Sequence, residues 1–335
     1  MIRLILIDGS QAGGQLVRTA CALSAVTGKA VKITNIRGAR PNPGLQIQHM
    51  EGIKSIAELC NAETKGLELN SRELEFCPKK LEAKDLKINI STAGSIGLVL
   101  QAVLLVTSQL EKSIKIEIDG GATWGKWAPP VLYLEKVLFP LIGEQSEIKI
   151  LKEGFYPKGG AEIEIITKLL ELNPIEILEK GEFKEVKGFS IASKSLEKSK
   201  VADRQTKTAK ELIKLKLNKD FDIETKYADS LSPGSGILIY IKTENSVIGV
   251  DSLGELRKST EDVAKEAVKN LVFEYANSVV DRHAADMLLP YMALSSGKIK
   301  TSEITHHIKT NIPVIEKFLP VKFSIDDKII SATRL

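Results

Sequence analysis

A repeated order of apolar and polar segments constrains the fold of this chain more than any other feature of its sequence. A helix-like segment rich in small residues, a strand-like segment, a loop, a second helix-like segment and further strands follow one another three times. The helix-like segments have apolar residues at three- and four-residue spacing, and the strand-like segments alternate or are rich in β-branched residues. The first copy comprises "GGQLVRTACALSAVTG", "AVKITNIRG", "GLQIQHMEGIKSIAELC" and "ELEFCP".

The second and third copies keep this order. The second runs through "GSIGLVLQAVLLVTS", "SIKIEIDGG", "APPVLYLEKVLFPLIG" and "GGAEIEIIT", and the third through "HAADMLLPYMALSSG", "KIKTSEI", "TNIPVIEKFLP" and "VKFSIDD". A unit of about 75 residues is too long for a solenoid repeat, so we predict that each copy forms a small αβ layer packed against the other two. The alternative is a chance likeness among ordinary αβ units.

Roughly 100 residues between the second and third copies break the pattern, as an inserted domain would. This stretch is rich in Lys and Glu and contains the strand-like "GFSIAS" and "ILIYIK" and the helix-like "RQTKTAKELIKLKL" and "STEDVAKEAVKNLVFEYA". We therefore predict an α+β fold in which a smaller αβ domain is inserted before the third repeat. The predicted boundaries are residues 1–180 for repeats one and two of a large domain, 181–276 for the inserted domain and 277–335 for repeat three.

Composition agrees with an ordinary globular protein. A chain of 335 residues with 43% hydrophobic content can bury a substantial core, and this length suggests about two domains. No segment approaches the roughly 18 consecutive apolar residues of a membrane span, and the sequence passes from Met1 directly into the strand-like "IRLILID". We therefore expect a cytoplasmic protein without a membrane partner. Cys21, Cys60 and Cys77 are widely spaced and form no metal-binding motif, so we expect three buried thiols.

Positive charge is concentrated near the N-terminus. The first 54 residues carry seven basic and two acidic side chains, so that their net charge of +5 exceeds the +4 of the whole chain and leaves −1 for the remainder. An anionic ligand near this segment is one interpretation, and a solvated basic face is the other.

Glycines precede the first predicted helix. Gly13 and Gly14 lie in the loop "SQAGGQ", and the helix is predicted to begin near Gln15. Backbone N–H groups at a helix start suit phosphate oxygens, and glycines allow a close approach, although glycine pairs also occur in ordinary turns. In the apolar segment "GLVLQAVLL", Gln101 is either a satisfied core amide or a ligand contact.

Two arginines follow the next predicted strand. Arg37 and Arg40 stand three residues apart in a loop that Pro41 and Pro43 stiffen. Guanidinium groups held in this way can grip a phosphate in bidentate fashion, which lysines do poorly. Two solvated surface arginines are the alternative.

Seven segments of the chain, taken in order, resemble the RNA 3′-terminal phosphate cyclase family. They are "DGSQAGGQLVRTACALSAVTGKAV", "NIRGARPNPGLQIQH", "STAGSIGLVLQAVLL", "APPVLYLEKVLFPLIG", "GFYPKGGAEIEI", "HAADMLLPYMAL" and "HHIKTNIPVIEKFLP". The resemblance extends from about residue 5 to 325. It implies a large domain of three βαβαββ-like units, similar to the C-terminal domain of a translation initiation factor and to enolpyruvyl transferases, with a smaller αβ domain inserted before the third unit.

The resemblance also implies a reaction, in which ATP is consumed and an RNA 3′-terminal phosphate becomes a 2′,3′-cyclic phosphate. Its nucleophile is His307 in "HHIKTNI", and the spacing to Thr310 and Asn311 favours His307 over the adjacent His306. A neutral imidazole nitrogen can attack the α-phosphorus of ATP, expel pyrophosphate and hold AMP as a phosphoramidate. AMP then passes to the RNA 3′-phosphate, and the vicinal 2′-hydroxyl closes the ring and releases AMP.

By the same resemblance, two groups of residues bind phosphates and nucleotide. The RNA terminal phosphate or the ATP phosphates are assigned to Arg37, Arg40, Gln48 and His49. The ATP site is assigned to Gly13, Gly14, Gln15, Arg18, Gln101, Pro129, His283, Ala284, Ala285, Asp286 and Met287. His283 replaces an aromatic residue of the family and Met287 a glutamine; a ring can still stack on adenine and a thioether can still pack there, with looser base selectivity.

The first glycine loop departs from the family pattern. Relatives have the longer loop Gly-Glu-Gly-Gly-Gly-Gln, whose glutamate helps to hold a divalent metal, whereas this chain has no acid between Asp8 and Gln15. We expect Mg²⁺ or Mn²⁺ to be held by Asp8 or by the triphosphate itself. The shortened loop also leaves two rival interpretations open: a non-catalytic ribosome-assembly protein of the same family, and an enolpyruvyl transferase, which shares only the repeat architecture.

Overall fold

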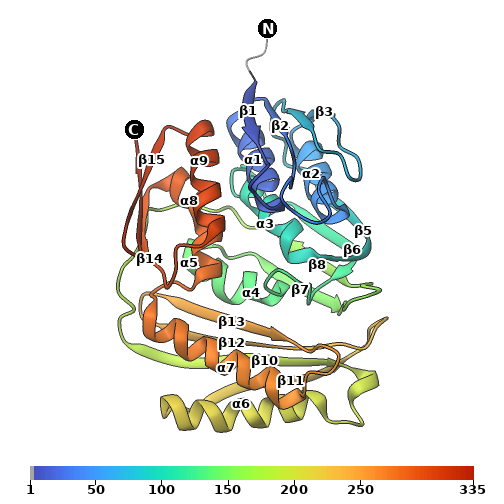
Figure 1. The fold of residues 1–335 in the computed structure, drawn as a ribbon, viewed down its shortest axis with the longest axis vertical. Helices are drawn as coiled ribbons and strands as arrows, with labels where there is room; N and C mark the ends of the chain where they lie inside the picture. Colours follow the sequence, from blue (N-terminus) through green and yellow to red (C-terminus); the bar gives the residue numbers. More distant parts are fainter. Residues whose placement is uncertain (1–3) are drawn as a thin grey trace.

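A computed structural model describes residues 4–335 of the chain. Three similar αβ units pack together, and a fourth sheet with two long helices projects from them (Figure 1). Among the described residues, none of the helices combines the length and the apolar character needed to cross a membrane.

The first unit has the chain order strand, helix, strand, helix, strand, strand. Its sheet has the spatial order β1-β2-β4-β3, in which β1 and β2 are parallel and the other neighbours antiparallel. Its elements are β1 (Ile5–Asp8), α1 (Gly14–Thr27), β2 (Val31–Thr34), α2 (Ile47–Leu59), β3 (Glu63–Lys65) and β4 (Leu74–Cys77).

The second unit repeats this arrangement. Its sheet has the order β5-β6-β8-β7, again with one parallel pair followed by two antiparallel pairs. A π-helical turn (Leu134–Leu138) joins its two short helices. The elements are β5 (Leu86–Ser95), α3 (Ile96–Thr107), β6 (Lys115–Ala122), α4 (Val131–Tyr133), α5 (Phe139–Ile142), β7 (Glu147–Lys152) and β8 (Glu162–Ile166).

The third unit has the same sheet topology, in the order β9-β14-β16-β15, but a long excursion interrupts it. Its elements are β9 (Ile175–Ile177), α8 (Arg282–Ser295), β14 (Gly297–Lys300), α9 (His306–Phe318), β15 (Val321–Asp326) and β16 (Ile329–Arg334). The predicted α+β class is confirmed. The excursion lies inside the third unit rather than before it, because β9 precedes the excursion and pairs in parallel with β14.

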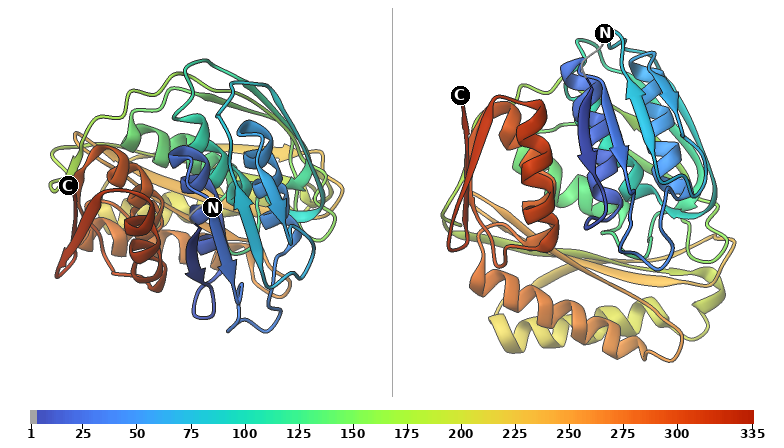
Figure 2. Two further views of the ribbon diagram at one scale, coloured as in Figure 1. Left: turned by 90° about the horizontal axis from the view of Figure 1, so that it is seen from above. Right: turned by 45° about the horizontal axis from the view of Figure 1, so that its top comes forward.

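The excursion forms a four-stranded sheet, β11-β10-β12-β13. Its elements are β10 (Phe183–Ser193), α6 (Val201–Leu217), β11 (Phe221–Ala228), β12 (Ser235–Thr243), β13 (Val247–Leu253) and α7 (Thr260–Asn277). Both helices cover the face that points away from the three units (Figures 1 and 2). On the opposite face, a Cβ on Gly249 of β13 would lie 2.4 Å from Val137 Cγ2 and 3.0 Å from Tyr133 Cε2, so a glycine permits this close approach.

The helices of the three units pack against one another. Helix α1 contacts α2, α3 and α9, and α8 contacts both α9 and α3; Figure 2 shows α9 of the third unit beside α1 of the first. Helix α3 is apolar on every side apart from Gln101 and Thr107, as expected of a helix surrounded by protein. The fully buried Ala20, Cys21 and Ala22 keep α1 thin, which lets its neighbours approach closely. The candidate site lies where α1, α3, α8 and α9 meet.

Two of the three cysteines follow the expectation of burial. Cys21 and Cys60 are buried, whereas Cys77 is only partly buried at the end of the strand β4. Burial raises the pKa of Cys60 to about 11, which keeps this thiol protonated and inert at neutral pH.

Candidate active site

His307 lies in the first turn of α9. Thr305, which caps that helix, also holds the carboxylate of Asp286 beside His307. Thr305 Oγ1 accepts a hydrogen bond from Ile308 N at 3.1 Å and donates one to Asp286 Oδ1 at 2.7 Å. Asp286 Oδ2 lies 3.5 Å from His307 Nδ1. A carboxylate on this side favours the tautomer with its proton on Nδ1, which leaves the Nε2 lone pair free. The His307 side chain is 46% exposed, so a ligand can reach it.

The glycine loop places free backbone donors opposite Nε2. Helix α1 begins at Gly14, and Gly13 caps it without a side-chain hydrogen bond. The first N–H groups of the helix are therefore available to an anion. A Cβ on Gly13 would lie 3.3 Å from Arg40 Nη2 and 4.0 Å from His307 Nε2. The loop, the guanidinium of Arg40 and the imidazole of His307 thus surround one small space.

His49 is a neutral imidazole packed against the same loop. Its Nδ1 accepts a hydrogen bond from Gln46 N at 3.2 Å, so its proton lies on Nε2. A Cβ on Gly14 would lie 2.0 Å from His49 Nε2, so no larger residue fits in place of this glycine. Burial, together with the charges of Arg18 and Arg37, lowers the pKa of His49 to about 3.

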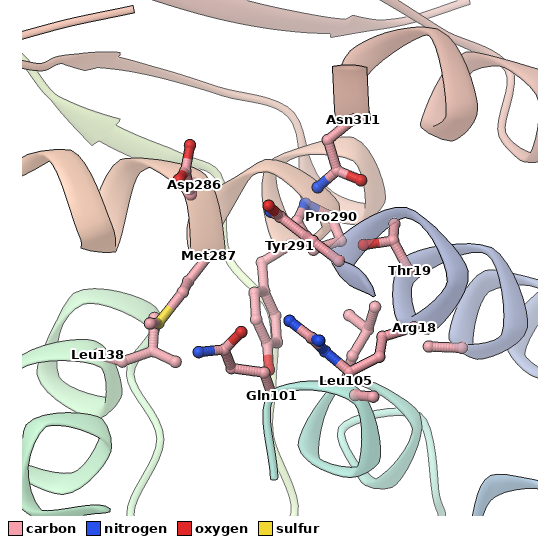
Figure 3. Close-up of a pocket in the computed structure, with 13 residues that line it drawn as sticks. Arg18, Thr19, Gln101, Leu105, Leu138, Asp286, Met287, Pro290, Tyr291 and Asn311 are labelled. Atoms are coloured by element: carbon pink, nitrogen blue, oxygen red, sulfur yellow. The ribbon is translucent and has the colours of Figure 1, made fainter. Parts of the chain in front are cut away.

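Arg18 is a buried cation without a counter-ion. Only 5% of the residue is exposed, and no hydrogen bond or ion pair to its side chain occurs within residues 4–335. Burial lowers its pKa to about 10, so it stays charged at neutral pH. It borders a cavity of about 30 Å³, as do Gln15 and Asn311, whose buried side-chain oxygens also lack partners in the described structure. Figure 3 shows Arg18, Gln101 and Asn311 reaching this cavity from different helices.

A pocket of about 250 Å³ lies next to this cavity and opens to solvent. It is large enough for part of a nucleotide, and it collects most of the residues predicted to bind ATP. The residues of that prediction that line it are Gln15, Arg18, Gln101, Pro129, His283, Asp286 and Met287, together with His307. Ala284 and Ala285 do not line it, because both are buried inside α8.

The two predicted phosphate-binding arginines differ in their surroundings. Arg37 has a left-handed backbone (φ 54°), and its Nη1 donates to Asn42 O at 2.6 Å and to Gly44 O at 2.9 Å. Arg37 therefore holds its own loop together. Arg40 is exposed, and within residues 4–335 its guanidinium has no partner, so it is free to bind an anion. Gln48 lies apart from the pocket, against Gly94 at the end of β5.

Asp8 organises the glycine loop. Its Oδ1 accepts hydrogen bonds from Ser10 N at 3.1 Å and Asn35 Nδ2 at 3.0 Å, and its Oδ2 accepts one from Ser10 Oγ at 2.8 Å. These hydrogen bonds, that of Asn35 above all, lower the pKa of Asp8. The part of the chain that the structure describes has no group of three or more His, Cys, Asp or Glu residues suited to a metal ion. His306 Nε2 lies 2.9 Å from Gln11 O and so joins α9 to the same loop.

The sequence did not assign three residues to this site, although Asn311 was part of the motif used to choose His307. Asn311 lies one helical turn after His307, so the i, i+4 spacing could have identified it. Thr305 is a typical helix-capping residue, but its bond to Asp286 joins segments 19 residues apart and cannot be read from local sequence. Trp127 lines the pocket beside Pro129 with 86% of its surface exposed.

Known proteins resemble this chain over nearly its whole length. The sequence model of the RNA 3′-terminal phosphate cyclase family matches residues 10–325. The RNA 3′-terminal phosphate cyclase of Pyrococcus abyssi is 44% identical over 333 residues, which cover 97% of this chain and 96% of that protein. The protein of the same name from Pyrococcus furiosus is 41% identical, over 96% of this chain and 95% of that protein. The one from Methanopyrus kandleri is 39% identical, over 97% of this chain and 96% of that protein. The chain belongs to the RNA 3′-terminal phosphate cyclase family.

Proposed function

We propose that this protein uses ATP to convert an RNA 3′-terminal phosphate into a 2′,3′-cyclic phosphate, with His307 as the adenylylated nucleophile. The observation that carries the proposal is the arrangement around His307. Asp286 lies 3.5 Å from Nδ1, while Nε2 faces the Gly13 backbone and Arg40. This is the arrangement that an attacking nitrogen needs beside a bound phosphate.

In the first step, Nε2 attacks the α-phosphorus of ATP and the bond to the β-phosphate oxygen breaks, so pyrophosphate leaves and AMP stays on His307. Asp286 stabilises the positive charge that develops on the ring. Arg18, Arg40 and the free N–H groups at the start of α1 stabilise the negative charge on the phosphate oxygens. Adenine is proposed to lie between Pro129 and His283, two of the residues that line the pocket.

Two further transfers follow. An oxygen of the RNA 3′-phosphate attacks the α-phosphorus, the P–N bond breaks and His307 regains its lone pair. The 2′-hydroxyl then attacks the terminal phosphorus, loses its proton to solvent and displaces AMP. Positioning and neutralisation of phosphate charge account for most of the catalysis in such transfers, which is why the site is rich in cations and backbone donors.

The described side chains do not form a metal site by themselves. Asp8, the acid expected to contribute, already accepts two hydrogen bonds from Ser10 and one from Asn35. A divalent ion, if the reaction uses one, would depend mainly on water and the phosphates of ATP, as Mg²⁺ often does.

Incubation with ATP labelled at the α-phosphate tests the proposal. We expect acid-labile label on the protein, as a phosphoramidate requires, and release of that label as AMP when RNA with a 3′-phosphate is added. The loop without an acid favours the rival function, a non-catalytic cyclase-like protein of ribosome assembly. Absence of label at saturating ATP with Mg²⁺ or Mn²⁺ would support that rival.

A further inference from the structure

A groove between the inserted domain and the second unit adjoins the nucleotide pocket. Its volume is about 910 Å³, and it is lined by Trp124, Trp127, Phe155 and Tyr156 from the second unit and by the segment 253–256 from the insertion. Trp127 lines both the groove and the nucleotide pocket, so the two spaces border the same residue.

Two of the four aromatic residues of the groove, Trp124 and Phe155, are buried, and the other two, Trp127 and Tyr156, are exposed. Trp124 and Phe155 are 2% and 3% exposed and form an isolated β-bridge with each other. A Cβ on Gly236 would lie 2.2 Å from the Trp124 ring, and one on Gly234 would lie 2.3 Å from the Phe155 ring. These two rings therefore fix the insertion against the second unit and form a rigid floor.

The exposed rings of Trp127 and Tyr156 do not fix the insertion in this way. They are 86% and 74% exposed, although both are large aromatic residues. Trp127 also has a left-handed backbone (φ 72°), which is a strained conformation for a bulky residue. Such strain persists where the surrounding structure imposes it and is concentrated at functional sites. Neither the exposure of these rings nor the strained backbone of Trp127 stabilises the fold, so we look for a ligand that explains them.

The charge around the groove suits a polyanion. Lys126 and Lys258 line the groove, and Lys126 Nζ lies 5.1 Å from the centre of the Trp127 ring. The acidic Glu255 makes only a distant contact of 3.7 Å with Lys126, and Lys258 pairs with Glu266. Exposed aromatic rings interleaved with cations are the usual platform for single-stranded nucleic acid, because every base has a face that stacks.

We propose that the 3′-terminal base of the substrate RNA stacks on Trp127 and that the preceding nucleotides follow the groove past Tyr156. This inference rests on the proposed function, since it assumes an RNA end whose phosphate reaches His307. Stacking on Trp127 would place the terminal nucleoside at the junction of groove and pocket, with its phosphate directed toward Arg40. The substrate would then be a single-stranded 3′ end of several nucleotides, because a duplex cannot offer its terminal bases to both rings.

Tryptophan fluorescence tests this inference without depending on catalysis. The chain has two tryptophans, of which only Trp127 is exposed. A five-nucleotide single-stranded RNA with a 3′-phosphate should quench the emission of the wild-type protein in the absence of ATP. The same RNA should leave the tryptophan emission of Trp127→Phe unchanged, because the remaining tryptophan, Trp124, is buried. Quenching that persists in Trp127→Phe, or none in the wild type, would overturn the proposal.

Affinity measured by the anisotropy of a labelled RNA gives a second readout. Trp127→Ala should weaken binding by about 5- to 150-fold, the range expected for the loss of one stacked base. Tyr156→Ala should weaken binding of the five-nucleotide RNA but not of a dinucleotide with a 3′-phosphate, because Tyr156 lines only the outer groove. The control Leu215→Ala alters an exposed apolar residue of α6 outside the groove and should change neither affinity.

Two results would assign these rings differently. If a non-hydrolysable ATP analogue quenches Trp127 and RNA does not, the ring serves adenine and the proposal is wrong. If Trp127→Ala and Tyr156→Ala bind RNA as the wild type does, the groove is not the RNA path. A protein that binds RNA in the expected way but is never labelled by ATP would instead contradict the proposed function and leave this inference standing.

Discussion

Asp286 Oδ2 lies 3.5 Å from His307 Nδ1, while the other oxygen of the same carboxylate accepts the Thr305 hydroxyl at 2.7 Å. One carboxylate from α8 therefore contacts both the capping residue of α9 and the imidazole in its first turn. The orientation of His307 depends on the contact between two helices of the third unit, and not on α9 alone.

Replacing this carboxylate by an amide should impair the nucleophile more than the fold. In Asp286→Asn, the amide can donate to Nδ1, which favours the tautomer whose proton is on Nε2 and removes the attacking lone pair. We expect the rate of self-adenylylation at saturating ATP to fall at least about 100-fold, by analogy with other carboxylate–histidine pairs, while the half-saturating ATP concentration changes much less. A loss confined to ATP affinity would show that Asp286 binds nucleotide and does not orient His307.

The two arginines of the first loop should differ when each is replaced by alanine. Arg37→Ala removes two hydrogen bonds to loop carbonyls and should lower the free energy of unfolding by about 1–3 kcal/mol. Arg40→Ala should change it by less than about 0.5 kcal/mol, because Arg40 is exposed, but should slow turnover roughly 10- to 100-fold. Denaturant unfolding and single-turnover kinetics separate these effects. Equal stability losses in both variants would contradict the distinction.

Arg18 should lower the stability of the ligand-free protein and strengthen its interaction with the phosphates of ATP. A buried charge without a partner is costly, so Arg18→Met should raise the free energy of unfolding of the ligand-free protein by about 1 kcal/mol or more. The same change should reduce the labelling rate at least about tenfold, because the phosphate oxygens lose a charged donor. The matched change at the surface, Arg40→Met, should not stabilise the protein. If Arg18→Met lowers the free energy of unfolding, the guanidinium of Arg18 is stabilised in the ligand-free protein by a bound water or ion, which would contradict the prediction.

His49 should make stability depend on pH in the mildly acidic range. Its pKa is about 3 in the folded protein and near 6.5 when unfolded, so below pH 6.5 the unfolded state binds more protons. The stability contributed by neutral His49 is thus complete above pH 6.5 and is lost at about 1.4 kcal/mol per pH unit as the pH falls toward 3. Urea unfolding at several pH values, compared with His49→Gln, should show this slope only in the wild type. Identical slopes would mean that His49 is already protonated in the fold.

Much of the fold could be predicted from sequence, because amphipathic helices and strands rich in β-branched residues have patterns that are visible in the local sequence. The helices expected around "LVRTACALSAVT", "LVLQAVLL" and "IPVIEKF" are α1, α3 and α9. The strand β9 was missed because it has three residues and finds its partner β14 only after the inserted domain. The placement of the insertion depended on that strand.

The candidate site could be predicted only where family resemblance supplied the contacts. Gln101 and Asp286 lie on different helices, and nothing in their local sequence indicates that both line one pocket. Phosphate binding by Arg37 stays a prediction, and its spacing from Arg40 gives no sign that its Nη1 donates to the carbonyls of Asn42 and Gly44 in its own loop. Metal binding by Asp8 likewise stays a prediction, and the local sequence does not indicate that this carboxylate accepts hydrogen bonds from Ser10 and Asn35. Such competition from backbone and neighbouring groups cannot be read from spacing.

Identification of the labelled histidine tests the account most directly. His306 and His307 are adjacent, but only His307 lies beside Asp286, whereas His306 contacts Gln11 O. After incubation with ATP labelled at the α-phosphate, His306→Ala should retain acid-labile label within a fewfold of the wild type, and His307→Ala should carry none. Label that persists in His307→Ala, or that disappears only in His306→Ala, would contradict the assignment of His307 as the nucleophile.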